Sequence, residues 1–358
     1  MTKPIRVLVV DDSTLVRKIL SEILSQEPDI EVVGTAQDPF VARDRIKELN
    51  PDVLTLDVEM PRMDGLTFLQ NLMRLRPMPV VMVSSLTERG AEVTLRALEL
   101  GAVDFVRKPG RDLAHALEAY GAELVEKVRM AAAVRVRPLT ARSSPPQASA
   151  VGSVLPKPKA PSGWASNRVL AIGASTGGTE AIKEVLLGLP PDAPGVVIGQ
   201  HIPPGFSAAF AERMNRLTGL VVKEAAEGDR VMPGHVYIAP GDRHLLLVRD
   251  GGRYSCRLTQ GELVNRHRPS VDVLFRSVAQ SAGKNACVAL LTGMGADGAQ
   301  GLKELRDLGV YTIAQDEATS VVWGMPGEAV KRGAAVEVVP IGGVADALLR
   351  GSVAKRML

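Results

Sequence analysis

Residues 5–12, Ile-Arg-Val-Leu-Val-Val-Asp-Asp, join a short apolar run directly to two carboxylates. An apolar run of this length, bounded by a helical pattern, is typical of a buried strand in a parallel sheet. The pattern of strand followed by helix is repeated along the first part of the chain. We expect strands at residues 5–10, 30–34, 53–56, 80–84 and 104–106. This alternation predicts a doubly wound α/β domain.

The alternation stops at residues 131–166 and then restarts. The interruption contains Ser-Ser-Pro-Pro at 143–146 and Pro-Lys-Pro-Lys at 156–159, which is the composition of a linker. We therefore expect two domains, at 1–125 and 167–358, joined by a Pro-rich linker at 126–166. The second is expected to be a Rossmann-like parallel sheet that also carries a β-hairpin.

Composition limits the classes of function. The 358 residues carry a net charge of +3, too little to indicate a nucleic-acid partner. Six basic residues and no acid lie between Arg129 and Lys159, which indicates a solvated linker. Cys256 and Cys287 have no metal-binding spacing. No signal peptide and no apolar run of the ~18 residues that span a bilayer occur, so we expect a cytoplasmic protein without membrane insertion.

Polar residues at the strand ends predict an acidic pocket. Asp11 and Asp12 follow the first expected strand, Asp57 follows the third, Ser84 ends the fourth and Lys108 follows the fifth. The carboxyl ends of parallel strands share one edge of the sheet, so these side chains should converge. Crowded carboxylates repel one another and suit Mg²⁺, and a carboxylate can accept a phosphoryl group. The alternative is that each acid caps a helix.

Together with Met60-Pro61, Asp64-Gly65 and Pro109, these residues resemble a response-regulator receiver domain. The resemblance implies a flavodoxin-like fold with a phosphorylation site at Asp57. It implies that Mg²⁺ is held by Asp12, Asp57 and the backbone carbonyl of Glu59, with Asp11 assisting. It also implies a set of switch residues, Ser84, Phe105 and Lys108.

A second candidate site begins at Gly-Ala-Ser-Thr-Gly-Gly, residues 173–178, between an expected strand and a helix. The sequence matches G-x-S-x-G, which exposes a nucleophilic serine at a sharp turn and near a helix N-terminus. A Gly-rich turn is also found in dinucleotide sites, but these require an acid at the end of the next strand. Gln200-His201 stands there instead, and a histidine suits a general base for Ser175.

Asp297 is the expected third member, because it follows the apolar strand near 287–291 in a Gly-rich loop. Its alternative role is a helix N-cap. The other four histidines, at 115, 235, 244 and 267, follow no strand that should neighbour that of Ser175. The chain order Ser…His…Asp differs from the α/β-hydrolase order, so the match to G-x-S-x-G does not predict that fold.

These motifs, with Ile238–His244, Arg268–Phe275 and Leu291–Gly298, make the whole chain resemble the CheB family of chemotaxis protein-glutamate methylesterases, which often also deamidate receptor glutamines. The resemblance implies that Ser175 is the nucleophile, His201 the base and Asp297 its orienting acid. Thr176 and Met294 match the family's oxyanion contacts. The implied partners are methyl-accepting chemotaxis receptors as substrates and a chemotaxis histidine kinase as phosphodonor.

The esterase reaction is expected to need no cofactor, and Mg²⁺ to serve the receiver domain only. We expect the first domain to control access to Ser175. Three other functions are alternatives to this interpretation. A transcriptional regulator would need a helical DNA-binding domain, which the sequence does not predict. A non-catalytic receptor-binding adaptor would not need the three residues Ser175, His201 and Asp297. An esterase for a small-molecule ester is compatible with all of them.

Overall fold

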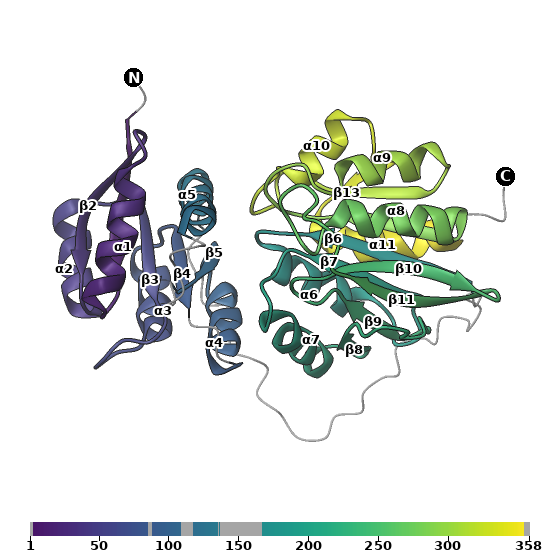
Figure 1. The fold of residues 1–358 in the computed structure, drawn as a ribbon, viewed down its shortest axis with the longest axis horizontal. Helices are drawn as coiled ribbons and strands as arrows, with labels where there is room; N and C mark the ends of the chain where they lie inside the picture. The colour runs from purple at the N-terminus through teal and green to yellow at the C-terminus, as the bar shows by residue number, and fades with distance from the viewer. Residues whose placement is uncertain (1–2, 85–87, 109–116, 135, 137–166, 354–358) are drawn as a thin grey trace. The chain divides into compact units, whose positions relative to one another are not determined.

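The computed structural model describes the chain except for residues 1–2, 85–87, 109–116, 135, 137–166 and 354–358. The chain divides into two compact units, Met1–Leu155 and Pro156–Leu358, each with its own sheet. Figure 1 shows the elements of both units. Most of the expected Pro-rich linker lies outside the described residues, as do His115 and Pro109.

The first unit is a five-stranded parallel sheet in the order β2-β1-β3-β4-β5. This is the flavodoxin-like order, as expected. Its strands are β1 (Ile5–Val10), β2 (Ile30–Ala36), β3 (Val53–Asp57), β4 (Val80–Ser84) and β5 (Asp104–Arg107). Its helices are α1 (Thr14–Ser25), α2 (Pro39–Leu49), α3 (Gly65–Leu75), α4 (Glu88–Glu99) and α5 (Leu117–Ala133). Contacts pair α1 with α5 and α3 with α4.

Helix α5 extends beyond the expected domain boundary at residue 125. It continues to Ala133, and Leu124, Val128 and Ala131 on it are fully buried. The helix packs on β3, β4 and β5, so its last two turns belong to the core of the first unit. The apolar spacing of these residues, rather than the change of composition further along the chain, decides where the helix ends.

The second unit contains a seven-stranded sheet in the order β14-β13-β12-β6-β7-β9-β8. All of its strand pairs are parallel. Its strands are β6 (Val169–Ala174), β7 (Gly195–Gln200), β8 (Val221–Glu224), β9 (His235–Ile238), β12 (Ala286–Leu290), β13 (Tyr311–Gln315) and β14 (Glu337–Val339). The expected hairpin is also present as β10 (His244–Asp250) and β11 (Arg253–Thr259), which pair antiparallel.

The helices of the second unit form two packed groups. Helix α6 contacts α7 and α11, while α8 contacts α9, and α9 contacts α10. Both groups contact the sheet, as a doubly wound fold requires. These helices are α6 (Gly178–Gly188), α7 (Phe206–Leu217), α8 (Val271–Ser281), α9 (Ala299–Asp307), α10 (Met325–Lys331) and α11 (Ile341–Val353), and a 3₁₀ turn covers Gly283–Asn285.

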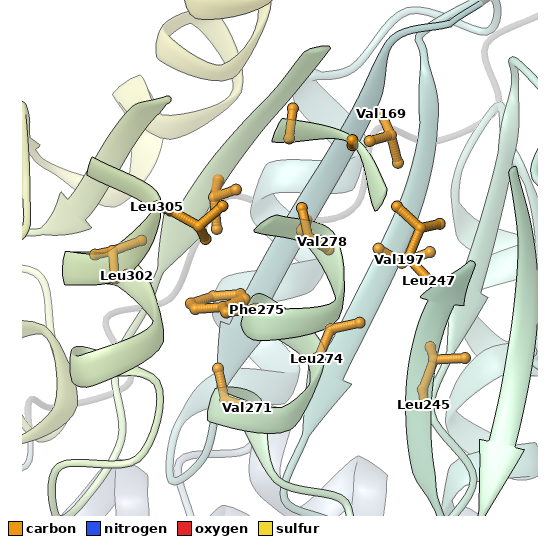
Figure 2. Packing of buried hydrophobic residues seen from close by; sticks show 14 of the residues in the cluster. Val169, Val197, Leu245, Leu247, Val271, Leu274, Phe275, Val278, Leu302 and Leu305 are labelled. Carbon is orange, nitrogen blue, oxygen red and sulfur yellow. The ribbon is translucent and has the colours of Figure 1, made fainter. Parts of the chain in front are cut away.

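Helix α8 is held in the centre of a large apolar cluster. Figure 2 shows its residues Leu274, Phe275 and Val278 between α9 on one side and strand β10 on the other. All three side chains are at most 1% exposed. Burial of this kind stabilises by roughly 1.5–3 kcal/mol per large apolar side chain. The apolar core therefore fixes the position of α8 in the second unit.

Strand β6 lies where the chain order of the sheet reverses. The strand that follows it, β7, pairs on one side, while β12 pairs on the other. In open α/β sheets, sites form beyond the carboxyl ends of the strands at such a point. Ser175 directly follows β6 there. In the part of the chain that the structure describes, no helix is long and apolar enough to cross a membrane.

Candidate active site and acidic pocket

The strand register places Ser175 beside His201. Ala174, the last residue of β6, pairs with Gln200, the last residue of β7. The ladder continues one step beyond both strands, because His201 N donates to Ala174 O at 3.1 Å. On the other side, Ser175 N donates to Thr292 O at 3.0 Å, which ties the β12 loop to the serine.

The three residues predicted as a triad meet in hydrogen-bonding geometry. His201 Nδ1 lies 3.0 Å from Ser175 Oγ, and His201 Nε2 lies 2.8 Å from Asp297 Oδ2. The side chains of His201 and Asp297 are only 7% and 2% exposed. If the proton of the neutral ring is on Nε2, it is donated to Asp297 and Nδ1 is left as an acceptor for the serine hydroxyl. The arrangement can therefore activate a nucleophile.

Asp297 is not the N-cap of its own helix α9, where Gly298 is the capping residue. It contacts the N-terminus of α8 instead. Its Oδ2 accepts from Val271 N at 2.6 Å, and its Oδ1 accepts from Ser270 Oγ at 2.9 Å and Asp272 N at 3.2 Å. The positive end of a buried helix is a favourable place for a carboxylate.

Several donors keep Asp297 ionised. Burial acts to raise the pKa of Asp297 and is the largest single effect, while the hydrogen bond and the charge of His201 act to lower it. Donation from Asn265 and Val271 adds to this effect, and the pKa of Asp297 is held below its ordinary value. A charged Asp297 fixes the orientation of the His201 ring and would stabilise it when protonated.

Two further residues contact the triad, although no sequence motif predicted a role for them. His267 stacks on His201 with ring centres 3.6 Å apart and planes at 15°. Asn265 Nδ2 donates to Asp297 Oδ1 at 2.7 Å. Both lie just before the Arg268–Phe275 motif, so their position beside a motif was the available signal. They follow no parallel strand, and strand-end reasoning therefore does not find them.

Gln200 links the backbones of the two reacting residues. Its Nε2 donates to Ser175 O at 2.9 Å and to His201 O at 3.0 Å. The amide is 3% exposed and packs on Gly178, where an added Cβ would lie 2.1 Å from Gln200 Oε1. Gln200 stands where a dinucleotide site would need an acid, and here it fixes the spacing of Ser175 and His201 instead.

The two residues predicted as oxyanion contacts lie in segments that touch Ser175. Thr176 follows it directly, is 7% exposed, and its carbonyl accepts from Thr292 Oγ1 at 3.0 Å. Met294 follows Gly293, where an added Cβ would lie 2.8 Å from Ser175 Cβ. The loop of Met294 therefore approaches the serine as closely as glycine allows. Their role toward an oxyanion stays a prediction.

The acidic pocket of the first unit is assembled as its strand ends predicted. Carboxylate oxygens of Asp11, Asp12 and Asp57 all lie within 4.8 Å of one another. Lys108 Nζ lies 2.8 Å from Asp57 Oδ2, 3.3 Å from Asp11 Oδ2 and 3.8 Å from Asp12 Oδ1. Glu59 N donates to Asp57 Oδ1 at 3.3 Å.

The electrostatics of this pocket suit a divalent cation. Asp11 and Asp57 are 0% and 1% exposed, and burial together with the charge of Asp11 raises the pKa of Asp57 to about 6. One lysine does not balance three acids, and hard oxygen ligands fit Mg²⁺. The alternative role as helix caps does not apply, because Ser13 caps α1 and Asp64 caps α3.

The predicted switch residues Ser84 and Phe105 lie on β4 and β5. Ser84 ends β4 and is fully buried, with Thr94 Oγ1 at 2.6 Å from its Oγ. Phe105 on β5 is 5% exposed, and Lys127 Nζ lies 5.2 Å from the centre of its ring. Both therefore occupy defined, buried positions on neighbouring strands. A switching motion of either residue stays a prediction.

The two sites define a class of protein. One α/β domain carries a phosphoacceptor-type acidic pocket, and a second carries the geometry of a Ser-His-Asp hydrolase. Residues 7–118 match the family model of the response regulator receiver domain, and residues 170–348 match that of the CheB methylesterase. The chain belongs to the CheB methylesterase family, and the resemblance seen in its motifs is confirmed.

Relatives and a solved structure agree with this assignment. The chain is 58% identical over 346 residues to a protein of Xanthomonas campestris pv. campestris named protein-glutamate methylesterase/protein-glutamine glutaminase 1, with 97% of each chain covered. It is 57% identical to the protein-glutamate methylesterase/protein-glutamine glutaminase of Nitrosomonas europaea, with 97% of this chain and 96% of that one covered. The crystal structure of the Thermotoga maritima CheB methylesterase catalytic domain is 37% identical, with a TM-score of 0.51, and the match covers 52% of this chain and 99% of that one.

Proposed function

We propose that this chain is a protein-glutamate methylesterase and protein-glutamine glutaminase that is controlled by phosphorylation of its receiver domain. The observation that carries the proposal is the position of His201 between Ser175 Oγ at 3.0 Å and Asp297 Oδ2 at 2.8 Å. Near-full-length similarity to proteins named for these two activities supports the choice of substrate class.

In the proposed reaction, Ser175 attacks the ester carbonyl of a methylated glutamate while His201 Nδ1 takes its proton. His201 then returns the proton to the leaving oxygen, so that methanol departs and an acyl-enzyme remains. A water molecule, deprotonated by His201, attacks the acyl-enzyme and releases glutamate and the serine hydroxyl. With a glutamine substrate the leaving group is ammonia. Asp297 holds the ring and stabilises its protonated form.

The negative charge that develops on the carbonyl oxygen needs donors. We assign this role to the backbone around Thr176 and Met294, close to the N-terminus of α6. Helix N-termini and loop amides stabilise oxyanions without reorganisation during the reaction. The tight approach of Gly293 to Ser175 supports the assignment, because it brings the loop of Met294 against the serine.

Control is assigned to the acidic pocket, with Asp57 as the residue that accepts a phosphoryl group from a chemotaxis histidine kinase. Asp12, Asp57 and the carbonyl of Glu59 would hold Mg²⁺, with Asp11 assisting. The ion would neutralise charge on the phosphoryl oxygens. Lys108 would bind a further oxygen, and Ser84 and Phe105 would respond to the new charge.

We assign the substrate to the cytoplasmic helices of chemotaxis receptors and the reaction to the cytoplasm. The buried free thiols of Cys256 and Cys287 are compatible with a reducing compartment. A non-catalytic adaptor is disfavoured, since the triad contacts would serve no purpose in it. The assay below separates receptor esters from small-molecule esters when p-nitrophenyl acetate is offered in parallel.

The test is methanol release from methylated receptor membranes, for wild type and Ser175→Ala, with and without a phosphodonor and Mg²⁺. We expect release by wild type, faster release with phosphodonor, and none above background with Ser175→Ala. Equal release by the two proteins would overturn the assignment of the nucleophile. Hydrolysis of the small ester alone would overturn the assignment of the substrate.

A further inference from the structure

A strained turn lies over the triad. Val264 and His267 exchange two backbone hydrogen bonds, Val264 N to His267 O at 3.1 Å and His267 N to Val264 O at 2.9 Å. The two residues between them are left-handed, with φ of 52° at Asn265 and 68° at Arg266. Consecutive left-handed residues are typical of a type I′ turn, which favours Asn at its first central position and Gly at its second. Strain of this kind persists where surrounding contacts fix it, and it gathers at functional sites.

The side chain of Asn265 contacts two carboxylates at once. Its Nδ2 donates to Asp297 Oδ1 at 2.7 Å and to Asp272 Oδ2 at 2.9 Å. A primary amide has two hydrogens, so one is available for each acid. Asp297 and Asp272 are 2% and 3% exposed, and the amide therefore lies between two buried acids.

The second acid, Asp272, is anchored independently of the triad. It lies in the first turn of α8, and its Oδ1 accepts from Gly301 N in α9 at 2.7 Å. Burial and the charge of Asp297 both raise the pKa of Asp272, against donation by Gly301 and Asn265. The charge of Asp297 therefore disfavours the charged form of Asp272, whose Oδ1 is fixed on Gly301 N.

We propose that Asn265 is a positioning residue that holds Asp297 against His201 by standing between the carboxylates of Asp297 and Asp272. The inference rests on the proposed role of Asp297 in the reaction. The donors Ser270 Oγ, Val271 N and Asp272 N also bind Asp297, but in the described part of the chain none of them donates to the carboxylate of Asp272. Among the described contacts, Asn265 alone donates to both acids.

Loss of this amide would leave two buried carboxylates facing each other. Asp297 would keep its contacts to Ser270 Oγ and Val271 N, but the unscreened charge of Asp272 would loosen its hold on His201 Nε2, and the ring would lose part of its orientation toward Ser175. In the proposed reaction Asn265 acts through Asp297 and not on the substrate. The expected effect is therefore on kcat and not on KM.

The variants are chosen to keep the turn intact. Asn265→Gly removes the amide but tolerates the left-handed backbone. Asn265→Asp keeps the shape and replaces the donor by an acceptor. Asp272→Asn removes the charge that Asn265 is proposed to offset. Asn215→Ala is a matched control, because Asn215 Oδ1 accepts from Val222 N at 2.9 Å in a different part of the unit.

All variants are measured as full-length protein with phosphodonor, by methanol release and by thermal unfolding. Asn265→Gly and Asn265→Asp should lower kcat on the order of 10–100-fold, because a small misplacement of a catalytic group can cost about 10²-fold, with KM within about twofold. Adding Asp272→Asn to Asn265→Gly should restore most of the lost kcat, since the repulsion is gone. Asn215→Ala should retain the kcat of wild type.

Two results would overturn the inference: kcat of Asn265→Gly equal to that of wild type, or no restoration by Asp272→Asn. If either result comes with a lowered Tm of Asn265→Gly, as in Asn215→Ala, the contacts of Asn265 contribute only to stability. Asp297→Ala is measured alongside. If it stays fully active, the proposed catalytic role of Asp297 has failed, whereas a silent Asp297→Ala with an active Asn265→Gly rejects only the role of Asn265.

Discussion

The imidazole of His267 lies flat on that of His201, with ring centres 3.6 Å apart and planes 15° from parallel. His201 is thereby covered on one ring face, while its two nitrogens point at Ser175 and Asp297. The stack restricts flipping of the His201 ring about its Cβ–Cγ bond. It also keeps bulk water from that face of the base.

The stack predicts different effects for two substitutions of His267. His267→Ala exposes the face of His201 and should lower kcat about tenfold, because the base loses orientation. His267→Phe keeps a flat ring in place and should retain most of the activity. Methanol release under saturating substrate measures both. Equal loss in the two variants would show that the nitrogens of His267, and not its ring face, are needed.

Asp297→Asn should nearly abolish turnover without loss of substrate binding. The amide can donate to His201 Nε2, which places the ring proton on Nδ1, where Ser175 requires an acceptor. A wrong tautomer of this kind costs about 10⁴-fold in kcat in the chymotrypsin triad, and we expect a loss of similar order. Steady-state kinetics with methylated receptor check the value. A decrease of less than tenfold would contradict the role given to the tautomer.

Acid should destabilise the second unit through Asp297. The pKa of Asp297 is lowered by folding, so its contribution is present above the unfolded value near 3.9 and is lost as the pH falls through the folded value. Between pH 7 and pH 3, wild type should therefore lose more unfolding free energy than Asp297→Asn. Urea unfolding followed by tryptophan fluorescence suits this, because Trp323 lies in the second unit, where its Nε1 donates to Gln315 O at 3.0 Å. Parallel losses would contradict the prediction.

Asp57→Asn should abolish the response to phosphodonor and leave basal esterase activity in place. The substitution removes the acceptor carboxylate of the pocket formed with Asp11 and Asp12. Chelation of divalent cations should have the same effect on wild type, because hard carboxylate ligands hold such ions in receiver domains. Initial rates with and without phosphodonor, and with and without EDTA, distinguish this from loss of the esterase itself, which chelation should spare.

Gly178→Ala should impair catalysis from outside the triad. The added Cβ would lie 2.1 Å from Gln200 Oε1 and 2.7 Å from Ala174 Cβ, so the amide that links Ser175 and His201 must move. Overpacking of this kind costs roughly 1–3 kcal/mol of stability, and kcat should fall with it. Gly219→Ala, whose nearest neighbour would be 3.5 Å away, is the control. Methanol release and thermal unfolding of the two variants check the contrast.

Strand-end reasoning predicted a large part of both sites from the sequence. Asp11, Asp57 and Lys108 converge because they follow parallel strands of one sheet, and the carboxyl ends of such strands share an edge. Ser175 and His201 meet for the same reason. The apolar runs of the strands are continuous and local, and they are therefore visible in the amino-acid sequence before any folding is considered.

What surrounds Asp297 was decided by the tertiary structure alone. Its donors come from the N-terminus of α8 and from Asn265, and His201 is covered by His267. These residues lie on a turn and at a helix end, where the sequence has no periodicity. Each is more than 60 positions from both Ser175 and His201 along the chain. Packing of α8 into the apolar core brings them to the sheet edge, and hydrophobic burial, which is non-directional, leaves no local signature of which contacts will result.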